Sequence, residues 1–331
     1  MARQTRVSNA SMMTFSEKLE RFSWALFVPM CIVLAISIVV LYSAGGGAWR
    51  PFALSQSAKI MVGFGIFFVA AFSNIKTWIK SAYVIYAIAL IMIILVTFVG
   101  HTGMGAQRWL NLGFVHIQPS ELIKIALVLA LARYFAWMNS VELSKFKNYI
   151  IPAAMLLVPF GLIVAQPDLG TALSLAMITT GVFYIVGANK KWFIIGAVLA
   201  VCAAPVVWFG GLHDYQRQRI ITFVNPDHDA RGAGYQINQA KIAFGSGGLI
   251  GKGYMKGSQS QQSFLPEKQT DFIFTMLGEE FGFIGAFGLI GLYSMIIMVL
   301  FWCAKTCRNR FGQLICFGFM LNFFIYYFIN I

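Results

Sequence analysis

Five charged residues lie beside or within one long apolar run toward the end of the chain. Glu267, Lys268 and Asp271 directly precede the run, and Glu279 and Glu280 lie inside it. Two interpretations of Asp271 follow. Its carboxylate can take a proton from a reacting hydroxyl group as a general base, or it can cap the N-terminus of the helix that follows. The residue types alone leave both interpretations open.

Three further ionisable residues lie in or beside apolar runs, where a membrane makes charge costly and each becomes a candidate functional residue. Glu121 and Lys124 are spaced i,i+3, so they can pair on one helix face. Such a pair either stabilises the helix alone or also binds a substrate. Asp168 follows Pro167 and precedes an apolar run, a pattern that is typical of a helix N-cap.

The glycine-rich segment 245–253 has the look of a phosphate-binding loop for nucleotides. However, Ser246 stands where that motif requires a glycine, and Gly253 stands where it requires Ser or Thr. Turns of this kind can still bind anions through backbone N–H groups, and Lys252 lies beside them. The four histidines have no paired ligand spacing, so no zinc site is predicted.

Membrane-spanning helices must position these residues. Hydrophobic residues make up 59% of the 331 positions and charged residues 11%, whereas about a quarter of a soluble domain is charged. The apolar runs predict an all-α polytopic membrane protein with nine spans, at about 22–43, 58–74, 81–99, 118–137, 150–166, 169–187, 192–211, 272–302 and 311–330. The eighth exceeds the roughly 25 residues of a normal span, so it is tilted, kinked or extends beyond the bilayer.

The distribution of Lys and Arg predicts a cytoplasmic N-terminus. With this orientation the inner segments carry thirteen of these residues, whereas the short outer loops carry Arg50, Lys59 and Arg108. We therefore expect one integral membrane domain over 1–331, with a cytoplasmic segment 1–21 and a large extracytoplasmic loop 212–271. A loop of that length is usually functional or disordered, and its aromatic residues predict that it is partly folded. The basic residues lie between apolar runs, so the net charge of +13 does not indicate nucleic acid as a partner.

Ordered motifs along nearly the whole chain resemble the SEDS (shape, elongation, division, sporulation) family of peptidoglycan polymerases, and its elongation branch in particular. They include Gly105-Ala-Gln-Arg-Trp-Leu-Asn-Leu-Gly113, Gln118-Pro-Ser-Glu121, Gln166-Pro-Asp-Leu-Gly-Thr171, His213-Asp-Tyr-Gln-Arg-Gln-Arg219, Ser258-Gln-Ser-Gln261 and Thr270-Asp-Phe-Ile-Phe274. The resemblance implies a SEDS-type helical bundle in the cytoplasmic (inner) membrane of a bacterium, which joins lipid II units into glycan strands at the outer face. It also implies a class B penicillin-binding protein (a transpeptidase) and other elongation-complex membrane proteins as partners.

The resemblance also implies residue roles. The catalytic aspartate of the family falls on Asp271, its motif acids fall on Glu121 and Asp168, and its lysine falls on Lys124. Because the pyrophosphate of lipid II leaves as a stable anion, it needs positive charge rather than an acid. The basic candidates for this task are Arg108, Arg217, Arg219, Lys252 and Lys268. This scheme requires no cofactor, leaves a divalent cation such as Mg²⁺ or Mn²⁺ as an open alternative, and identifies no metal site.

Two features depart from the family pattern. Gln269 stands where the family usually has His before Thr-Asp. The chain ends at Ile331, before the last loop and tenth helix of the family. If that loop and helix complete the outer cavity, a chain that ends there should have little polymerase activity, whereas the extended chain is active. Two other functions stay open. One is a lipid II flippase, and the other is a non-catalytic scaffold for a penicillin-binding protein, in which Asp271 is only a cap.

Overall fold

The structure is a computed structural model that describes residues 15–20, 22–103, 106–111, 116–211, 214–225, 233–258 and 269–331. The chain forms two compact units. Unit 1 combines the described residues up to Phe22 with 72–195 and 297–328, and unit 2 combines 23–71, 196–296 and 329–331. The expectation of one domain over 1–331 stays a prediction.

Eight helices among the described residues are long and apolar enough to cross a membrane. They are α3 (Trp24–Ala44), α4 (Phe52–Phe72), α5 (Ile75–Val99), α8 (Ile150–Ala165) with the preceding turn η2 (Phe146–Tyr149), α9 (Leu169–Val186), α10 (Lys190–Val206) with the π-helical turn η3 (Val207–Gly211), α14 (Ile273–Thr306) and α15 (Arg310–Asn330). Each coincides with a predicted span, so the polytopic helical fold is confirmed.

The remaining predicted span, 118–137, corresponds to α6 (Pro119–Phe135), which is 17 residues long. Its residues 126–132 are buried without interruption, so protein surrounds this part of the helix. A helix that is enclosed by protein needs less hydrophobicity than one that faces lipid, because its polar side chains can find partners there. This explains how α6 carries Glu121, Lys124 and Arg133.

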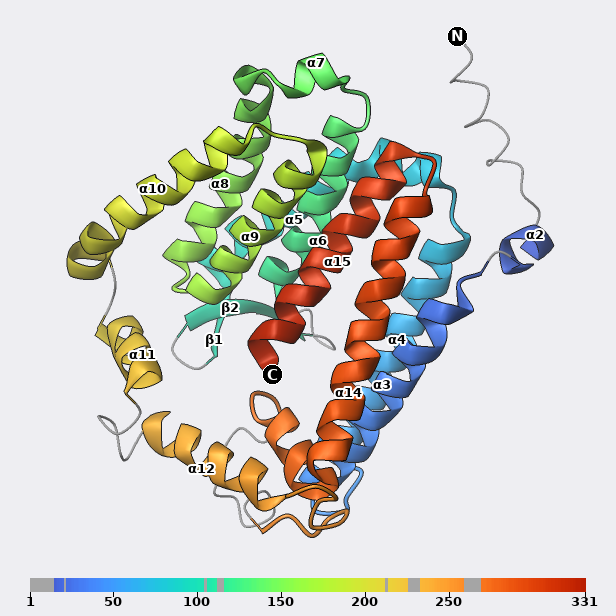
Figure 1. The fold of residues 1–331 in the computed structure, drawn as a ribbon, viewed down its shortest axis with the longest axis vertical. Coiled ribbons are helices and arrows are strands. Elements are labelled where there is room, and N and C mark those ends of the chain that lie inside the picture. Colours follow the sequence, from blue (N-terminus) through green and yellow to red (C-terminus); the bar gives the residue numbers. More distant parts are fainter. Residues whose placement is uncertain are drawn as a thin grey trace. The chain divides into compact units, whose positions relative to one another are not determined.

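In unit 1, helices α5, α6, α8 and α9 lie side by side (Figure 1). The rings of Phe135, Tyr149 and Phe183 pack together where α6, η2 and α9 meet, with centroids 5.3–5.9 Å apart. Helix α15 approaches α6 closely at Gly318, where an added Cβ would lie 2.4 Å from a methyl carbon of Val128. This close approach brings the C-terminal part of α15 next to the polar end of α6.

A short antiparallel sheet connects α5 to α6, a feature that the all-α prediction did not include. Its strands β1 (His101–Gly103), β2 (Ala106–Asn111) and β3 (His116–Ile117) form the order β1-β2-β3. The last strand leads directly into Gln118, which precedes α6. The sheet therefore determines where the first turn of α6 begins.

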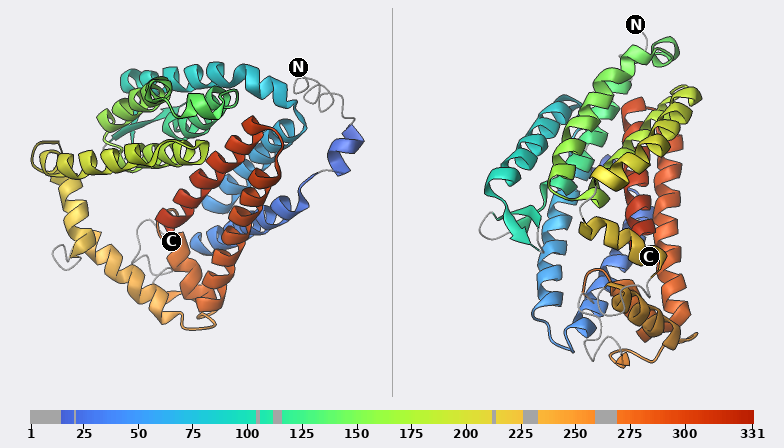
Figure 2. Two further views of the ribbon diagram at one scale, coloured as in Figure 1. Left: turned by 45° about the horizontal axis from the view of Figure 1, so that its top comes forward. Right: turned by 90° about the vertical axis from the view of Figure 1, so that its left-hand side faces the viewer.

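In unit 2, α3 and α4 pack through aromatic side chains and run side by side (Figure 2). The predicted outer loop contains two helices, α11 (Asp214–Val224) and α12 (Ala233–Ser246), which confirms for the described residues that this loop is partly folded. Two short helices complete the described chain, α2 (Phe15–Glu20) and α7 (Ser140–Leu143).

The long helix α14 is broken at Gly282. It spans 34 residues, and Gly282 adopts φ 68° and ψ −166°, a left-handed conformation that essentially only glycine adopts without strain. The break leaves a short helix, Ile273–Phe281, before a long one. Of the three explanations for the excessive length of this span, a kink is therefore the one observed.

Candidate functional site

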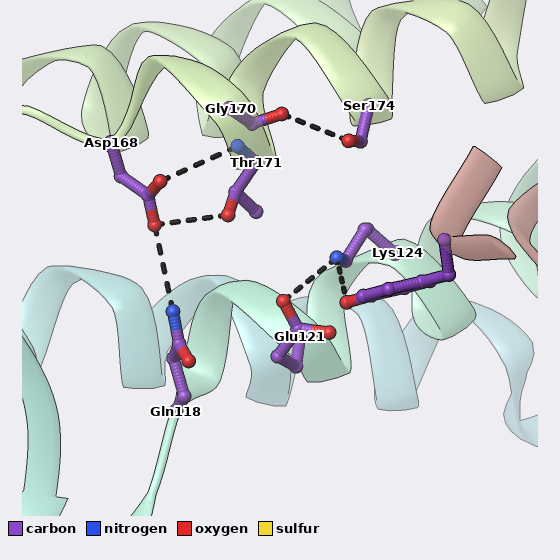
Figure 3. Close-up of polar contacts among 8 residues, drawn as sticks. Gln118, Glu121, Lys124, Asp168, Gly170, Thr171 and Ser174 are labelled. Atoms are coloured by element: carbon purple, nitrogen blue, oxygen red, sulfur yellow. Dashed lines mark hydrogen bonds and ion pairs between the residues drawn. The ribbon is translucent and has the colours of Figure 1, made fainter. Parts of the chain in front are cut away.

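Two clusters of buried polar side chains contain most of the charged residues that the sequence placed within apolar runs. The first cluster, hereafter the α6–α9 cluster, lies in unit 1 and consists of Gln118, Glu121, Lys124, Asp168, Thr171 and Tyr326 (Figure 3). The second, the α12–α14 cluster, lies in unit 2 and consists of Ser43, Lys252, Ser258, Glu279 and Glu280.

Asp168 begins α9 as its N-cap, as predicted. Its carboxylate accepts hydrogen bonds from the backbone N–H of Thr171 at 3.4 Å and from the Thr171 hydroxyl at 2.9 Å. Gln118 reaches the same carboxylate from the start of α6, with its side-chain nitrogen 3.5 Å from Asp168 Oδ2. The cap therefore also links the first turns of α6 and α9 (Figure 3).

Glu121 and Lys124 form the i,i+3 ion pair that their spacing predicted. The distance from Lys124 Nζ to Glu121 Oε1 is 2.7 Å. Lys124 also donates to the hydroxyl of Tyr326 on α15, and its ammonium lies 4.1 Å from the centroid of the Tyr326 ring. The Lys124 side chain is 2% exposed, whereas that of Glu121 is 40% exposed. The Glu121 carboxylate is therefore accessible, whereas the Lys124 ammonium is enclosed by protein.

The α12–α14 cluster contains a buried ion pair that the sequence did not predict. Lys252 Nζ lies 2.8 Å from Glu279 Oε1, and the Glu279 side chain is fully buried. Ser258 contacts both partners, because its hydroxyl oxygen lies 2.7 Å from Lys252 Nζ and 3.3 Å from Glu279 Oε1. Next to Glu279, the carboxylate of Glu280 accepts a 2.5 Å hydrogen bond from Ser43, at the end of α3.

Tyr254 adds a further contact from the same segment to α3. Its hydroxyl donates to the backbone oxygen of Val39 at 3.0 Å, and its ring lies 6.0 Å from that of Phe281. Burial, and then the negative charge of Glu280, raise the pKa of Tyr254. The hydroxyl therefore keeps its proton and remains a donor at neutral pH.

Asp271 lies two residues before α14, in a turn, and its side chain is exposed. Within the described part of the chain no hydrogen bond or ion pair involves its carboxylate. The helix-capping bond that the alternative interpretation requires is therefore not formed.

Two of the five basic residues predicted to face a pyrophosphate have described side chains, and both have protein partners. Arg217 donates to the backbone oxygens of Trp208 at 2.9 Å and Phe209 at 3.0 Å, so its guanidinium holds the end of the helix formed by α10 and η3. Lys252 pairs with Glu279, as described above. The side chains of the other three lie outside the described residues; these are Arg108, Arg219 and Lys268.

Sequence reasoning missed the partners of the buried charges rather than the charges themselves. Glu279 and Glu280 were visible as acids in an apolar run, which is a signal of function or pairing. Lys252 is 27 positions from Glu279 and Ser43 is 237 positions from Glu280, so no local spacing connects them. Tyr326 was equally hidden, since it is 202 positions from Lys124.

Sequence comparison identifies relatives over nearly the whole chain. The family model of FtsW, RodA and SpoVE, described as "Cell cycle protein", matches residues 17–331. Peptidoglycan glycosyltransferase MrdB of Escherichia coli (strain K12) is 37% identical over 327 residues, which cover 98% of this chain and 86% of that protein. The probable peptidoglycan glycosyltransferase FtsW of Trichlorobacter lovleyi is 32% identical over 324 residues, which cover 93% and 82%.

Solved structures show the same fold. A chain from a peptidoglycan synthase complex, described as coordinating polymerization and crosslinking, matches with a TM-score of 0.76 at 28% identity and covers 91% of this chain and 83% of that chain. The crystal structure of the Rod shape determining protein RodA from Thermus thermophilus matches with a TM-score of 0.64 at 26% identity, covering 91% and 81%.

Proposed function

The chain belongs to the FtsW/RodA/SpoVE family, and we infer from this that it is a peptidoglycan glycosyltransferase. The similarity to the glycosyltransferase MrdB of Escherichia coli extends over 98% of the chain and carries the assignment. The eight candidate membrane spans among the described residues suit an enzyme whose substrate is attached to a lipid. The family is also the one that the motifs resemble.

We propose lipid II as the substrate and the outer face of the cytoplasmic membrane as the site of reaction, in cell-wall elongation. The N-terminus is then cytoplasmic, as the distribution of Lys and Arg favours. The segment 212–271, with α11, α12 and Asp271, then lies outside the cytoplasm, where the lipid-linked disaccharide is available.

Asp271 is the proposed general base. Its carboxylate takes the proton of the acceptor hydroxyl while the hydroxyl oxygen attacks the anomeric carbon of the donor sugar. A new C–O bond forms, and the bond from that carbon to the pyrophosphate breaks with its electron pair on the departing anion. Single displacement inverts the linkage from α to β. The exposed position of Asp271 and the lack of a partner for it among the described residues support this role.

The α6–α9 cluster is the proposed binding site for polar groups of the substrate. Glu121 is accessible, and Lys124 holds its carboxylate at 2.7 Å. Asp168 contacts Gln118, which precedes the same helix. Positive charge for the pyrophosphate comes, in this proposal, from the basic residues of the outer segments, including Arg108, Arg219 and Lys268.

Among the described residues no group of three or more His, Cys, Asp or Glu side chains could hold a metal ion. Mg²⁺ is usually held by only one or two carboxylates together with substrate phosphates, so a divalent cation such as Mg²⁺ or Mn²⁺ stays a prediction. The steps above use only residues of the chain itself. As a partner we propose a class B penicillin-binding protein, since a structural neighbour belongs to a complex that couples polymerization to crosslinking.

The test is polymerisation of lipid II by the purified protein. Wild type is expected to form glycan polymer, and Asp271→Asn is expected to reduce the rate about 10²–10⁴-fold, because it removes a proton acceptor. Asn caps helices about as well as Asp, so a residue that acted only as a cap would leave activity near normal.

Asp214→Asn is the matched control. Asp214 lies on the same outer segment, its side chain is 95% exposed, and its contact with Arg217 is 3.5 Å. It should retain wild-type activity. Equal polymer yields from wild type and Asp271→Asn would overturn the role of Asp271. Translocation of lipid II without polymer would favour a flippase.

A further inference from the structure

We propose that the buried Lys252–Glu279 ion pair is a positioning device, which holds the short helix Ile273–Phe281 and thereby sets the location of Asp271. The inference rests on the proposed function, with Asp271 as the base. Lys252 then acts through the protein, and its charge is not directed at the pyrophosphate.

The first support is a set of backbone hydrogen bonds between the glycine-rich turn and α14. They replace the helical hydrogen bonds that the break at Gly282 removes. The N–H of Lys252 donates to the oxygen of Glu279 at 3.0 Å, and the N–H of Gly253 donates to that of Glu280 at 3.1 Å. On the far side of the break, the N–H of Phe283 donates to the oxygen of Gly248 at 2.9 Å. The segment that carries Lys252 is thus attached to both sides of the break.

The turn and the helix touch so closely that side chains are excluded. A Cβ on Gly247 would lie 2.1 Å from the oxygen of Gly278, and one on Gly251 would lie 2.1 Å from the oxygen of Glu280. Contacts below 3.0 Å do not occur for real Cβ atoms. These glycines therefore allow the backbone of the turn to contact the backbone of the helix directly. No room for a phosphate group remains between the turn and the helix.

The second support is the electrostatics of the pair. Glu279 is fully buried, so its charge requires a partner, and removal of one member of a buried ion pair is strongly destabilising. Lys252 is only 26% exposed and already pairs with Glu279 and Ser258. Its ammonium has the contacts of a structural counter-ion.

The third support is the rigid connection from this pair to Asp271. Residues Ile273–Phe281 form about 13 Å of helix. Phe244 of α12 packs on this helix, since its ring stacks on Phe274 at 5.6 Å and covers Gly278. Asp271 lies two residues before the first residue of this short helix, and Glu279 lies near its last residue. A shift of the Glu279 end would therefore move the carboxylate of Asp271.

A double-mutant cycle tests the proposal in the full chain. Lys252→Met removes the ammonium that pairs with the buried Glu279 carboxylate, and Glu279→Gln removes the charge of that carboxylate. Each single variant should lower kcat for lipid II polymerisation about 10²-fold with KM nearly unchanged, because misplacement of a catalytic group by about 1 Å has an effect of that size. The double variant removes both charges and should recover to within about tenfold of wild type.

Lys256→Met is the matched control. Lys256 is an exposed lysine four positions from Lys252, and within the described residues its side chain has no hydrogen bond or ion pair. It should keep wild-type kcat and KM. If Lys252 instead binds the pyrophosphate, the double variant will be at least as impaired as Lys252→Met alone, and that result overturns the proposal.

A second measurement does not depend on activity. Asp271→Cys is prepared after replacement of the five native cysteines, Cys31, Cys202, Cys303, Cys307 and Cys316, and is labelled with a membrane-impermeant maleimide. Lys252→Met should change the labelling rate, and the double variant should restore it. An unchanged rate in all variants overturns the proposal. If wild type forms no polymer, the proposed function fails, and the labelling rates alone decide whether the ion pair positions residue 271.

Discussion

The α6–α9 and α12–α14 clusters have the same balance of charge, one lysine and two acids, but they are held together differently. In the first, the ion pair is local, because Glu121 pairs with Lys124 three positions away, and Asp168 caps the helix that begins beside it. In the second, the ion pair joins positions 27 apart. Exposure differs as well, because Glu121 is 40% exposed and Glu279 is fully buried.

The difference shows that a charge within an apolar run has two distinct uses. An accessible carboxylate whose counter-ion lies behind it can meet a substrate, as we propose for Glu121. A carboxylate enclosed on all sides can act only on the protein around it. Burial and the sequence distance to the partner separate these uses better than the presence of charge does.

The largest effect on the free energy of unfolding is expected at Gly282, where α14 contacts the backbone of the glycine-rich turn. Gly282→Ala places a Cβ 2.3 Å from the nitrogen of Gly251, at a residue with φ 68°. Backbone strain and the clash together should lower the free energy of unfolding by more than about 3 kcal/mol. Thermal unfolding and the yield of monodisperse protein measure this.

Gly288→Ala is the control for that substitution. It lies on the same helix, and its added Cβ would meet nothing within 4 Å. Because Ala favours a helix by about 1 kcal/mol over Gly, this variant should be as stable as wild type or more so. If the two variants unfolded at the same temperature, the close contact at Gly282 would not exist.

An intermediate effect is expected in the α6–α9 cluster. Glu121→Gln leaves Lys124 buried without its carboxylate and should lower the free energy of unfolding by about 1–2 kcal/mol, a value moderated by the partial exposure of Glu121. Asp168→Asn should cost less, since Asn still caps α9. Asp271→Asn should cost less than about 0.5 kcal/mol, as surface changes usually do. If Asp271→Asn lowered the free energy of unfolding more than Glu121→Gln does, this order of effects would be wrong.

A smaller effect than that of Glu121→Gln is expected at Tyr326, which contacts Lys124 through its hydroxyl group and its ring. Tyr326→Phe removes the acceptor for Lys124 but keeps the ring, whose centroid lies 4.1 Å from the ammonium. The expected loss is about 1 kcal/mol. Tyr184→Phe, at an exposed tyrosine of unit 1, is the control and should change nothing. If a thermal shift assay gives Tyr326→Phe and Tyr184→Phe the same melting temperature, the hydroxyl group of Tyr326 does not contribute to the stability of the cluster.

Those parts of the fold that follow from local patterns could be predicted from the sequence. Hydropathy located the spans to within a few residues at most ends, and i,i+3 spacing identified the ion pair of Glu121 with Lys124. The Pro-Asp pattern located the cap at Asp168. The length of the run 272–302 predicted an irregularity that the break at Gly282 explains.

The rest depends on contacts between distant segments. The strands between α5 and α6 are too short to give a periodic signal. The pairing of Lys252 with Glu279 requires the glycine-rich turn to lie against the break, and only the folded chain provides that placement.

The close contact between the glycine-rich turn and α14 also limits how this region can change under selection. Any single-base change that replaces a glycine adds at least a Cβ, and at Gly251 that atom would collide with the backbone of Glu280. A compound that binds against the half-buried backbone of Gly251 would therefore meet a position where resistance mutations also unfold the protein. Escape would have to arise at neighbouring side chains, which makes this turn a durable surface for an inhibitor to contact.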